Sequence, residues 1–315
     1  MKRVVSVSLG SSKRDNVSHA EILSTEFEYF EPSSVEEAVN LLGKYKEQSA
    51  VLSGGTDLLV RIKQKRIEPR YLVNIKRIDA LRRIEKTPEL LRIGAATSLL
   101  EIERHDFVRS NLEALHEAVS SIGSMQIRNM ATLGGNISRA SPAGDSPPPL
   151  LVLGARANLR ETEGNRSIPL EEFFKGPGRT IMKPSELFVN LEIPNPPKAS
   201  GTAFLKVART GMDLAKVNAA SMITVEDDVV QSCRVALGGV APTPIRVKKA
   251  EELLIGEKAT DARFADAAKA ASDEVRPIAS SHRHKRSTAQ YRINVSGALV
   301  KRTLQLARDR SLGRK

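Results

Sequence analysis

Apolar and polar positions along the chain alternate between short runs typical of strands and segments with helical spacing. The segment "FEYF" predicts a short strand, and "VEEAVNLLGKY" predicts a helix whose start is signalled by Pro32–Ser34. The apolar residues of that helix, Val35, Ala38, Val39 and Leu42, recur at helical intervals. We therefore expect this helix to bury one face against a core.

Strands and helices mix along the rest of the chain without regular alternation. Strands are predicted in "SAVL", "RYLVNI", "LLRIGAATSL", "ELFVNLEIP" and "GTAFLKVAR", helices in "DLLVRIKQ", from "SLLEIERHDFV" to "LHEAVSSI" and from about Lys248 onward, and hairpins at Glu163–Asn165 and around Glu226–Asp228. A proline-rich link at Asn195–Ser200 marks the predicted boundary between two domains. This order predicts an α+β fold rather than a doubly wound sheet.

Composition limits what kind of protein this is. The chain has 315 residues and 40% hydrophobic content, which is ordinary for a globular protein, and no apolar run reaches the roughly 20 residues of a membrane-spanning helix. Its first residues, "MKRVVSVSLGSSKRDN", resemble a basic arm more than a signal peptide. The single cysteine, Cys233, excludes an internal disulfide and an iron–sulfur cluster built from this chain alone, so we expect a cytoplasmic protein.

The net charge of +12 raises the possibility of nucleic-acid binding, because lysine and arginine neutralise phosphates. Aromatic residues make up only 4% of the chain, there is no tryptophan for base stacking, and the basic residues are spread widely. We therefore interpret the charge as a solvated surface or as a docking face for an acidic partner subunit.

A first glycine turn lies in "VLSGGTDLL". An apolar strand end leads into two glycines, and Thr56 and Asp57 then open a helix, so several backbone N–H groups can point at one spot. Such a turn suits a phosphate group. An ordinary strand-to-helix turn is the alternative.

A second glycine turn, "ATLGGNI", is interpreted as a repeat of this design. It reads as a strand followed by Thr132, Gly134, Gly135 and Asn136, with polar side chains beside exposed backbone donors. Neither turn has the lysine of a Walker A loop, and together they predict a two-sided cradle for a pyrophosphate. Downstream, Asp145 is either the cap of the helix beginning in "SPPPLLVLGA" or a ligand contact.

Five segments together resemble the FAD-binding medium subunit of molybdenum hydroxylases, the xanthine dehydrogenase and carbon monoxide dehydrogenase family. They are "SGGTDLL", "QIRNMATLGGNISRASPAGDSPPPLLVLGA", "RTGMDLAKVNAAS", "RVALGGVAPTPIRVKKAEELLIGE" and "STAQYRINVSGALVKRTL". The resemblance implies a split FAD-binding domain of the vanillyl-alcohol oxidase and p-cresol methylhydroxylase type, followed by a smaller C-terminal α+β domain of the CO dehydrogenase flavoprotein type. The predicted division is a basic arm at 1–24, an FAD-binding domain at 25–197 and the C-terminal domain at 198–310.

The resemblance also implies which residues contact the flavin. The two turns would hold its pyrophosphate, Asp145 would contact the flavin, Ile122 and Phe188 would supply apolar contacts, and Lys206 a basic one. The full predicted set is Ser53, Gly54, Gly55, Thr56, Asp57, Leu58, Ile122, Thr132, Gly134, Gly135, Asn136, Asp145, Phe188 and Lys206. Ile122 and Phe188 have core packing as the alternative.

No general acid–base or metal-ligand constellation stands out, so no catalytic residue and no metal ligand is predicted on this chain. Because neither cysteine nor histidine lies near a glycine turn, the FAD is expected to be noncovalent. The resemblance implies electron transfer within a heterotrimer, or a dimer of heterotrimers. A large subunit would carry molybdopterin, a small subunit would carry two [2Fe–2S] clusters, and NAD⁺ or a quinone would be the acceptor.

Two other functions remain open from the residues themselves. One is a free-standing flavoprotein oxidoreductase of the same fold, which would need a catalytic side chain over the flavin. The other is a basic non-enzymatic binding protein, which would be colourless and would bind nucleic acid with a steep salt dependence.

Overall fold

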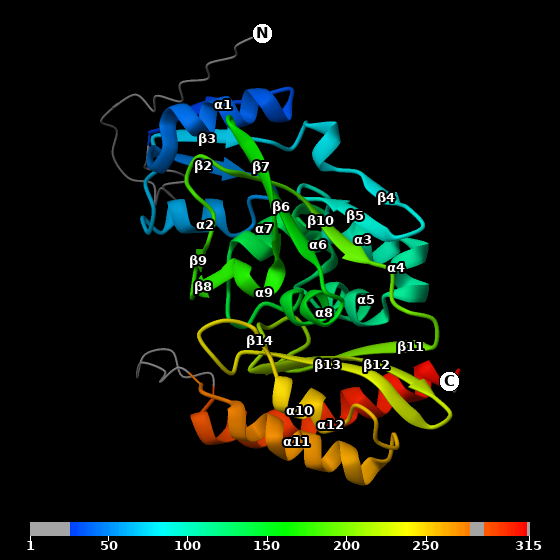
Figure 1. Cartoon of the computed structure of the whole chain (residues 1–315). Coiled ribbons are helices and arrows are strands. Elements are labelled where there is room, and N and C mark those ends of the chain that lie inside the picture. The colour runs from blue at the N-terminus through cyan, green and yellow to red at the C-terminus, as the bar shows by residue number, and fades with distance from the viewer. Residues whose placement is uncertain (1–25, 278–286, 314–315) are drawn as a thin grey trace.

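The computed structural model describes residues 26–277 and 287–313 and has three tiers of structure (Figure 1). A small parallel sheet with two helices occupies one end, a five-stranded sheet with its helices lies in the middle, and a four-stranded sheet backed by the C-terminal helices forms the other end. The predicted α+β class is confirmed. The N-terminal arm, His282 and His284 lie outside the described residues.

The first tier is a three-stranded parallel sheet in the order β1-β3-β2. Ser34 caps α1 by accepting a hydrogen bond from the N–H of Glu37, as the sequence predicts, and the apolar face of this helix is buried. The elements are β1 (Glu28–Phe30), α1 (Val35–Tyr45), the 3₁₀ turn Lys46–Gln48, β2 (Ser49–Leu52), α2 (Leu58–Lys63) and β3 (Tyr71–Asn74).

The second tier is a five-stranded antiparallel sheet in the order β4-β5-β10-β6-β7. Its strands are β4 (Ile84–Lys86), β5 (Leu90–Gly94), β6 (Arg156–Glu161), β7 (Gly164–Pro169) and β10 (Leu187–Pro194). The 3₁₀ turn Asp79–Leu81 precedes β4. The segments between the strands form α3 (Leu99–Arg104), α4 (Asp106–Asn111), α5 (Glu113–Ser120), α6 (Met125–Met130), α7 (Leu133–Ser138), α8 (Pro147–Val152), α9 (Leu170–Phe173), β8 (Phe174–Gly176) and β9 (Arg179–Thr180).

The third tier is an antiparallel sheet in the order β11-β12-β13-β14 that is covered on both faces. Its elements are β11 (Ser200–Val207), β12 (Val217–Glu226), β13 (Val229–Gly238), β14 (Ile245–Arg246), α10 (Lys248–Glu252), α11 (Asp261–Glu274) and α12 (Ala289–Ser311). Along β12, Ala219 and Ile223 pack in the core with α11 and α12, whereas Ala220 and Met222 pack in the core of the second tier. This alternation joins the two parts through a buried interface.

Most elements follow the sequence pattern. Both hairpins form, with turn residues 162–163 between β6 and β7, and Asp227 and Asp228 at positive φ between β12 and β13. Cys233 is a buried free thiol, and burial raises its pKa far above the ordinary range. No helix among residues 26–277 and 287–313 is long and apolar enough to cross a membrane.

At the second glycine turn the expected strand is wrong, and further along the chain one of the two alternatives for Asp145 is excluded. The segment before the turn is the helix α6 rather than a strand, and only an isolated bridge joins Thr132 to Ser98. Asp145 does not cap α8, because Ser146 occupies the N-cap position and makes no capping bond with its side chain. The helix predicted to begin in "SPPPLLVLGA" does form, and Pro147 is its first residue, where the missing N–H of proline would have no helical partner. The domain boundary at Asn195–Ser200 stays a prediction.

Candidate functional site

A cavity of about 430 Å³ lies where the two glycine turns meet. Its size is that of a pocket for an organic ligand, and its lining is mainly apolar with a few polar groups. Of the predicted site residues, Lys206 does not line it, and the remainder do: Ser53, Gly54, Gly55, Thr56, Asp57, Leu58, Ile122, Thr132, Gly134, Gly135, Asn136, Asp145 and Phe188. Sequence reasoning thus selected residues that the fold brings together.

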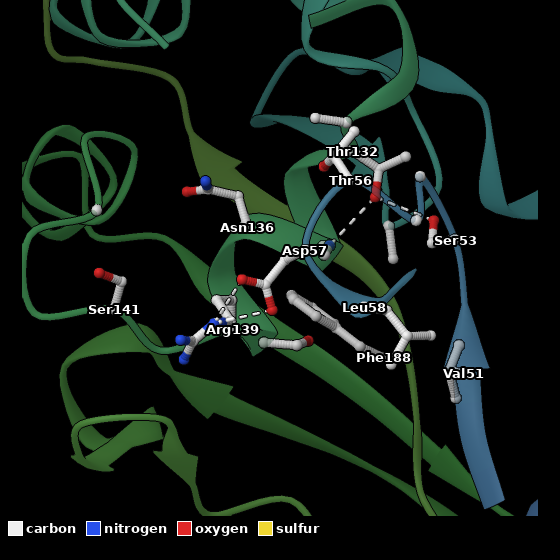
Figure 2. Close-up of a pocket in the computed structure, with 18 of the residues that line it drawn as sticks. Val51, Ser53, Thr56, Asp57, Leu58, Thr132, Asn136, Arg139, Ser141 and Phe188 are labelled. Atoms are coloured by element: carbon white, nitrogen blue, oxygen red, sulfur yellow. Dashed lines mark hydrogen bonds and ion pairs between the residues drawn. The ribbon is translucent and has the colours of Figure 1, made fainter. Parts of the chain in front are cut away.

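The two turns touch each other although they are far apart in the sequence. Ser53 Oγ and Thr132 Oγ1 are 3.0 Å apart and hydrogen-bonded (Figure 2). Gly54 has no room for a side chain, because a Cβ there would collide with the carbonyl oxygen of Met130. The prediction that the turns are adjacent is confirmed, and Gly54 is the residue that permits their close approach.

The first turn presents a row of free backbone donors. None of the N–H groups from Gly54 to Leu58 donates a hydrogen bond to another residue within the described ranges. Gly55 takes a φ of +77°, which turns the chain from the end of β2 into α2. Successive N–H groups at a strand-to-helix turn are a binding site for an anion such as phosphate.

The second turn differs from the sequence expectation of exposed donors. The N–H groups of Leu133 and Gly134 donate to the carbonyls of Thr97 and Ala95, and the N–H of Gly135 donates to Thr132 Oγ1 at 3.2 Å. Thr132 is the N-cap of α7, so these donors hold the turn in place. The second turn therefore offers the pocket its close-packed surface and its polar side chains rather than a second row of free N–H groups.

An ion pair crosses the pocket between the turns. Asp57, at the start of α2, is 2.9 Å from Nε of Arg139, which follows α7 (Figure 2). Arg139 lies three residues after Asn136, so helical spacing brings both to the same cavity. Arg61 lies 3.9 Å from the same carboxylate. A guanidinium beside the free donors of the first turn adds positive charge where an anion would bind.

Asp145 lies deep in the pocket wall and is held by two side chains. Its Oδ2 accepts from Lys206 Nζ at 3.0 Å, and its Oδ1 accepts from Asn218 Nδ2 at 2.7 Å. Burial raises the pKa of Asp145, and the neighbouring Lys206 opposes that rise by favouring the charged form. This network, rather than a helix cap, determines where the carboxylate of Asp145 lies.

Lys206 lies behind Asp145 rather than on the pocket surface. Its ammonium also donates to the carbonyl of Ser121 at 2.6 Å and of Asp213 at 3.3 Å, so its three protons have acceptors within the protein. Direct contact between Lys206 and a flavin therefore stays a prediction.

Apolar side chains complete the lining. Phe188 projects from β10, next to a bulge in its pairing with β6, and is 5.7 Å from Phe173 between ring centroids. Ile122 is partly exposed and packs against the same core. These surfaces suit a planar aromatic ligand, although Phe188 is also a core residue, as the alternative interpretation held.

Comparison with known proteins decides the family. Residues 25–196 match the family model "FAD binding domain in molybdopterin dehydrogenase", and residues 202–307 match "CO dehydrogenase flavoprotein C-terminal domain". The chain belongs to the FAD-binding medium subunits of molybdenum hydroxylases. As such it is an oxidoreductase subunit that carries an FAD-binding domain.

Several relatives of this FAD-binding subunit are similar over most of their length. The nicotinate dehydrogenase FAD-subunit of Eubacterium barkeri is 35% identical over 75% of this chain and 81% of its own. The carbon monoxide dehydrogenase medium chain of Hydrogenophaga pseudoflava is 32% identical over 89% of this chain and 96% of its own. A solved carbon monoxide dehydrogenase from that organism superposes with a TM-score of 0.86 at 33% identity, again over 89% and 96% of the two chains.

The pocket of this medium subunit fits FAD. A dinucleotide needs donors for its diphosphate and an apolar slot for its ring system, and the structure supplies unpaired N–H groups in the first turn and the Ile122 and Phe188 surfaces. The contacts of individual residues with FAD stay predictions. The relatives named above are dehydrogenase subunits, which argues against the basic non-enzymatic binding protein.

Sequence reasoning missed several residues of the site. Arg139 follows the second turn at helical spacing from Asn136, a signal that could have identified it. Asn218 lies in the quoted motif "RTGMDLAKVNAAS" without a role assigned to it. Ser146 donates to Asn136 Oδ1 at 2.6 Å, a contact that no local pattern indicates.

We expect the substitution Thr132→Ala to weaken FAD binding about tenfold, because the hydroxyl joins the two turns and caps α7. Loss of the cap should also lower the free energy of unfolding by about 1 kcal/mol. Thr260→Ala removes an equivalent cap from α11 in the C-terminal part and serves as the control. Titration of apoprotein with FAD should show weakening in Thr132→Ala alone, and equal affinities in both variants would contradict the role of the hydroxyl.

Proposed function

We propose that this subunit holds one FAD noncovalently and relays electrons within a heterotrimer or a dimer of heterotrimers. A large subunit would carry the molybdopterin cofactor and oxidise the substrate, and a small subunit with two [2Fe–2S] clusters would deliver electrons to this chain. The acceptor would be NAD⁺ or a quinone, and the complex would be cytoplasmic. FAD supplies chemistry that joins one-electron and two-electron transfer, and the protein contributes binding, orientation and electrostatics.

Each part of the chain has a separate task in this proposal. The free N–H groups of Gly54 to Leu58, with Arg139 nearby, would bind the diphosphate, and Thr132 would fix the second turn against the first. Ile122 and Phe188 would exclude water from one side of the ring system, while Asp145 would supply a fixed negative charge or a hydrogen-bond acceptor at the pocket wall.

The observation that carries the proposal is the row of unpaired backbone donors beside a pocket of suitable size, in a chain of this family. The assembly is supported by the names of the relatives, which include a carbon monoxide dehydrogenase medium chain and a subunit alpha of the 6-hydroxypseudooxynicotine dehydrogenase complex of Paenarthrobacter nicotinovorans.

Affinity purification of the tagged chain from its native host tests the proposal. We expect stoichiometric FAD, together with a large subunit containing molybdenum and a small subunit containing iron. Anaerobic addition of NADH to the purified complex would bleach the flavin if NAD⁺ is the acceptor, whereas bleaching by a reduced quinone alone would indicate a quinone. A colourless chain purified without partners would contradict the proposal.

A further inference from the structure

The segment with residues 141–146 lines the pocket, but the C-terminal sheet holds it in place. The N–H of Gly239 donates to the carbonyl of Pro142 at 2.6 Å, and Asn218 Nδ2 donates to the carbonyl of Gly144 at 3.0 Å. Ser141 and Gly144, along with Asp145, belong to the lining of the cavity. One wall of the pocket in the second tier therefore depends on contacts from the third tier.

Asn218 and Lys206 form a matched pair of donors. They lie directly opposite each other in the antiparallel pairing of β12 with β11. Each donates to a different oxygen of Asp145, at 2.7 Å from Asn218 and 3.0 Å from Lys206. With both oxygens engaged by side chains from neighbouring strands, the carboxylate group of Asp145 has one position and one orientation.

Burial of Asn218 is not explained by packing. Its side chain is 0% exposed, and its Oδ1 has no hydrogen-bond partner among the described residues. Gly238 lies opposite it on β13, and a Cβ at Gly238 would collide with Asn218 Oδ1. Burying an amide with an unpaired oxygen costs free energy that an apolar side chain of similar size would avoid. The donors of this amide must therefore serve another purpose.

We propose that Asn218 is a positioning residue, which together with Lys206 fixes the carboxylate of Asp145 at the pocket wall, so that the C-terminal sheet completes the FAD site. This inference rests on the proposed function. Asn218 acts through Asp145 and is not itself part of the cavity lining.

The test compares FAD affinity and thermal stability of the full chain in three single variants. Asn218→Ala removes the donor, and Asn218→Asp keeps the shape while placing a second carboxylate beside Asp145. Ser221→Ala is the control, because Ser221 is also fully buried on β12. This substitution likewise removes one buried hydrogen bond, the bond between the hydroxyls of Ser221 and Thr303. We expect Asn218→Ala to weaken FAD binding about tenfold and Asn218→Asp to weaken it further, with no change in Ser221→Ala.

A double variant separates positioning from stability. Asp145→Asn combined with Asn218→Asp exchanges the amide and the carboxylate, so that Lys206 keeps an anionic neighbour. We expect Asn218→Asp alone to lower the midpoint of thermal unfolding, because two carboxylates then face each other. The exchange should restore that midpoint, because one carboxylate and one amide again face each other. FAD affinity should stay at least about tenfold below that of the unmodified chain, because the negative charge has left the pocket wall.

Two results would overturn the inference while leaving the proposed function intact. One is an unchanged FAD affinity in a folded Asn218→Ala or Asn218→Asp protein. The other is an exchange variant that binds FAD as tightly as the unmodified chain. If the unmodified chain itself bound no FAD, the proposed function would fail, and this inference would fail with it.

Discussion

Gly54→Ala is expected to weaken FAD binding by at least about 100-fold. Its new Cβ would meet the backbone of Met130 and Ala131, which cannot move aside as a flexible side chain could. The two turns would have to separate, and the bond between Ser53 and Thr132 would break together with the alignment of the free N–H groups. Titration of the apoprotein with FAD, followed by flavin fluorescence, measures the effect.

Gly164→Ala is the matched control for this substitution. Gly164 opens β7, and a Cβ there would have no heavy atom within 4 Å. The control should bind FAD as the unmodified chain does. A Gly54→Ala protein that is folded and retains full FAD affinity would show that the close approach of the turns is unimportant for the cofactor.

Lys206→Met is expected to destabilise the fold by about 3 to 5 kcal/mol at neutral pH, because it leaves the carboxylate of Asp145 buried without its cationic partner. The side chains of this ion pair are 10% and 4% exposed, so water cannot replace the lost ammonium. The variant should also lose FAD during purification, since Asp145 would move to reach solvent. Chemical denaturation and flavin content measure the two effects.

The destabilisation by Lys206→Met should depend on pH. Burial already raises the pKa of Asp145 in the folded chain, and removal of Lys206 would raise it further. A carboxyl group whose pKa is higher in the folded than in the unfolded chain stabilises the fold at pH values below its unfolded pKa, which is about 4. This stabilisation is lost as the pH rises through the folded pKa. The deficit relative to the unmodified chain should therefore be largest near pH 8 and shrink toward pH 5.

Lys183→Met provides the comparison for this prediction. Lys183 pairs with Glu161 at 2.8 Å, but its side chain is 56% exposed, so solvent screens the interaction. Its removal should change stability little. A Lys206→Met protein whose deficit is as small as that of Lys183→Met, or is independent of pH, would contradict the role assigned to the buried pair.

Local patterns predicted the first turn well because its structure is local. A strand end, two glycines and a helix start are consecutive in the sequence, and Gly55 takes the positive φ that glycine permits. The second turn has the same residue types but a different structure, because Leu133 and Gly134 find acceptors in Thr97 and Ala95, which only the fold brings near. A motif of residue types could not distinguish a free donor from an occupied one.

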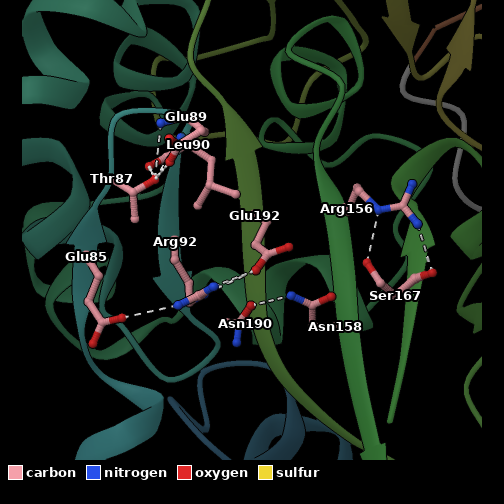
Figure 3. A network of polar contacts seen from close by, with 10 residues as sticks. All are labelled: Glu85, Thr87, Glu89, Leu90, Arg92, Arg156, Asn158, Ser167, Asn190 and Glu192. Atoms are coloured by element: carbon pink, nitrogen blue, oxygen red, sulfur yellow. Dashed lines mark hydrogen bonds and ion pairs between the residues drawn. The ribbon is translucent and has the colours of Figure 1, made fainter.

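The register of paired strands and the polar pairs between distant residues could not be predicted from the sequence either. On one face of the five-stranded sheet, Arg92 pairs with Glu192 at 2.8 Å and with Glu85 at 3.5 Å, and Asn158 donates to Asn190 at 2.7 Å (Figure 3). Alternation predicts that polar residues share that face, but not which residues lie opposite. The same limit applies to Asp145, whose partners Lys206 and Asn218 lie 61 and 73 positions further along the chain.

The structure of the FAD-bound chain tests most directly whether two touching turns from distant parts of the sequence hold one diphosphate. We expect diphosphate oxygens within hydrogen-bond distance of several N–H groups between Gly54 and Leu58, with Thr132 and Gly135 on the other side. A diphosphate bound elsewhere, or one that contacts only one of the turns, would contradict this arrangement.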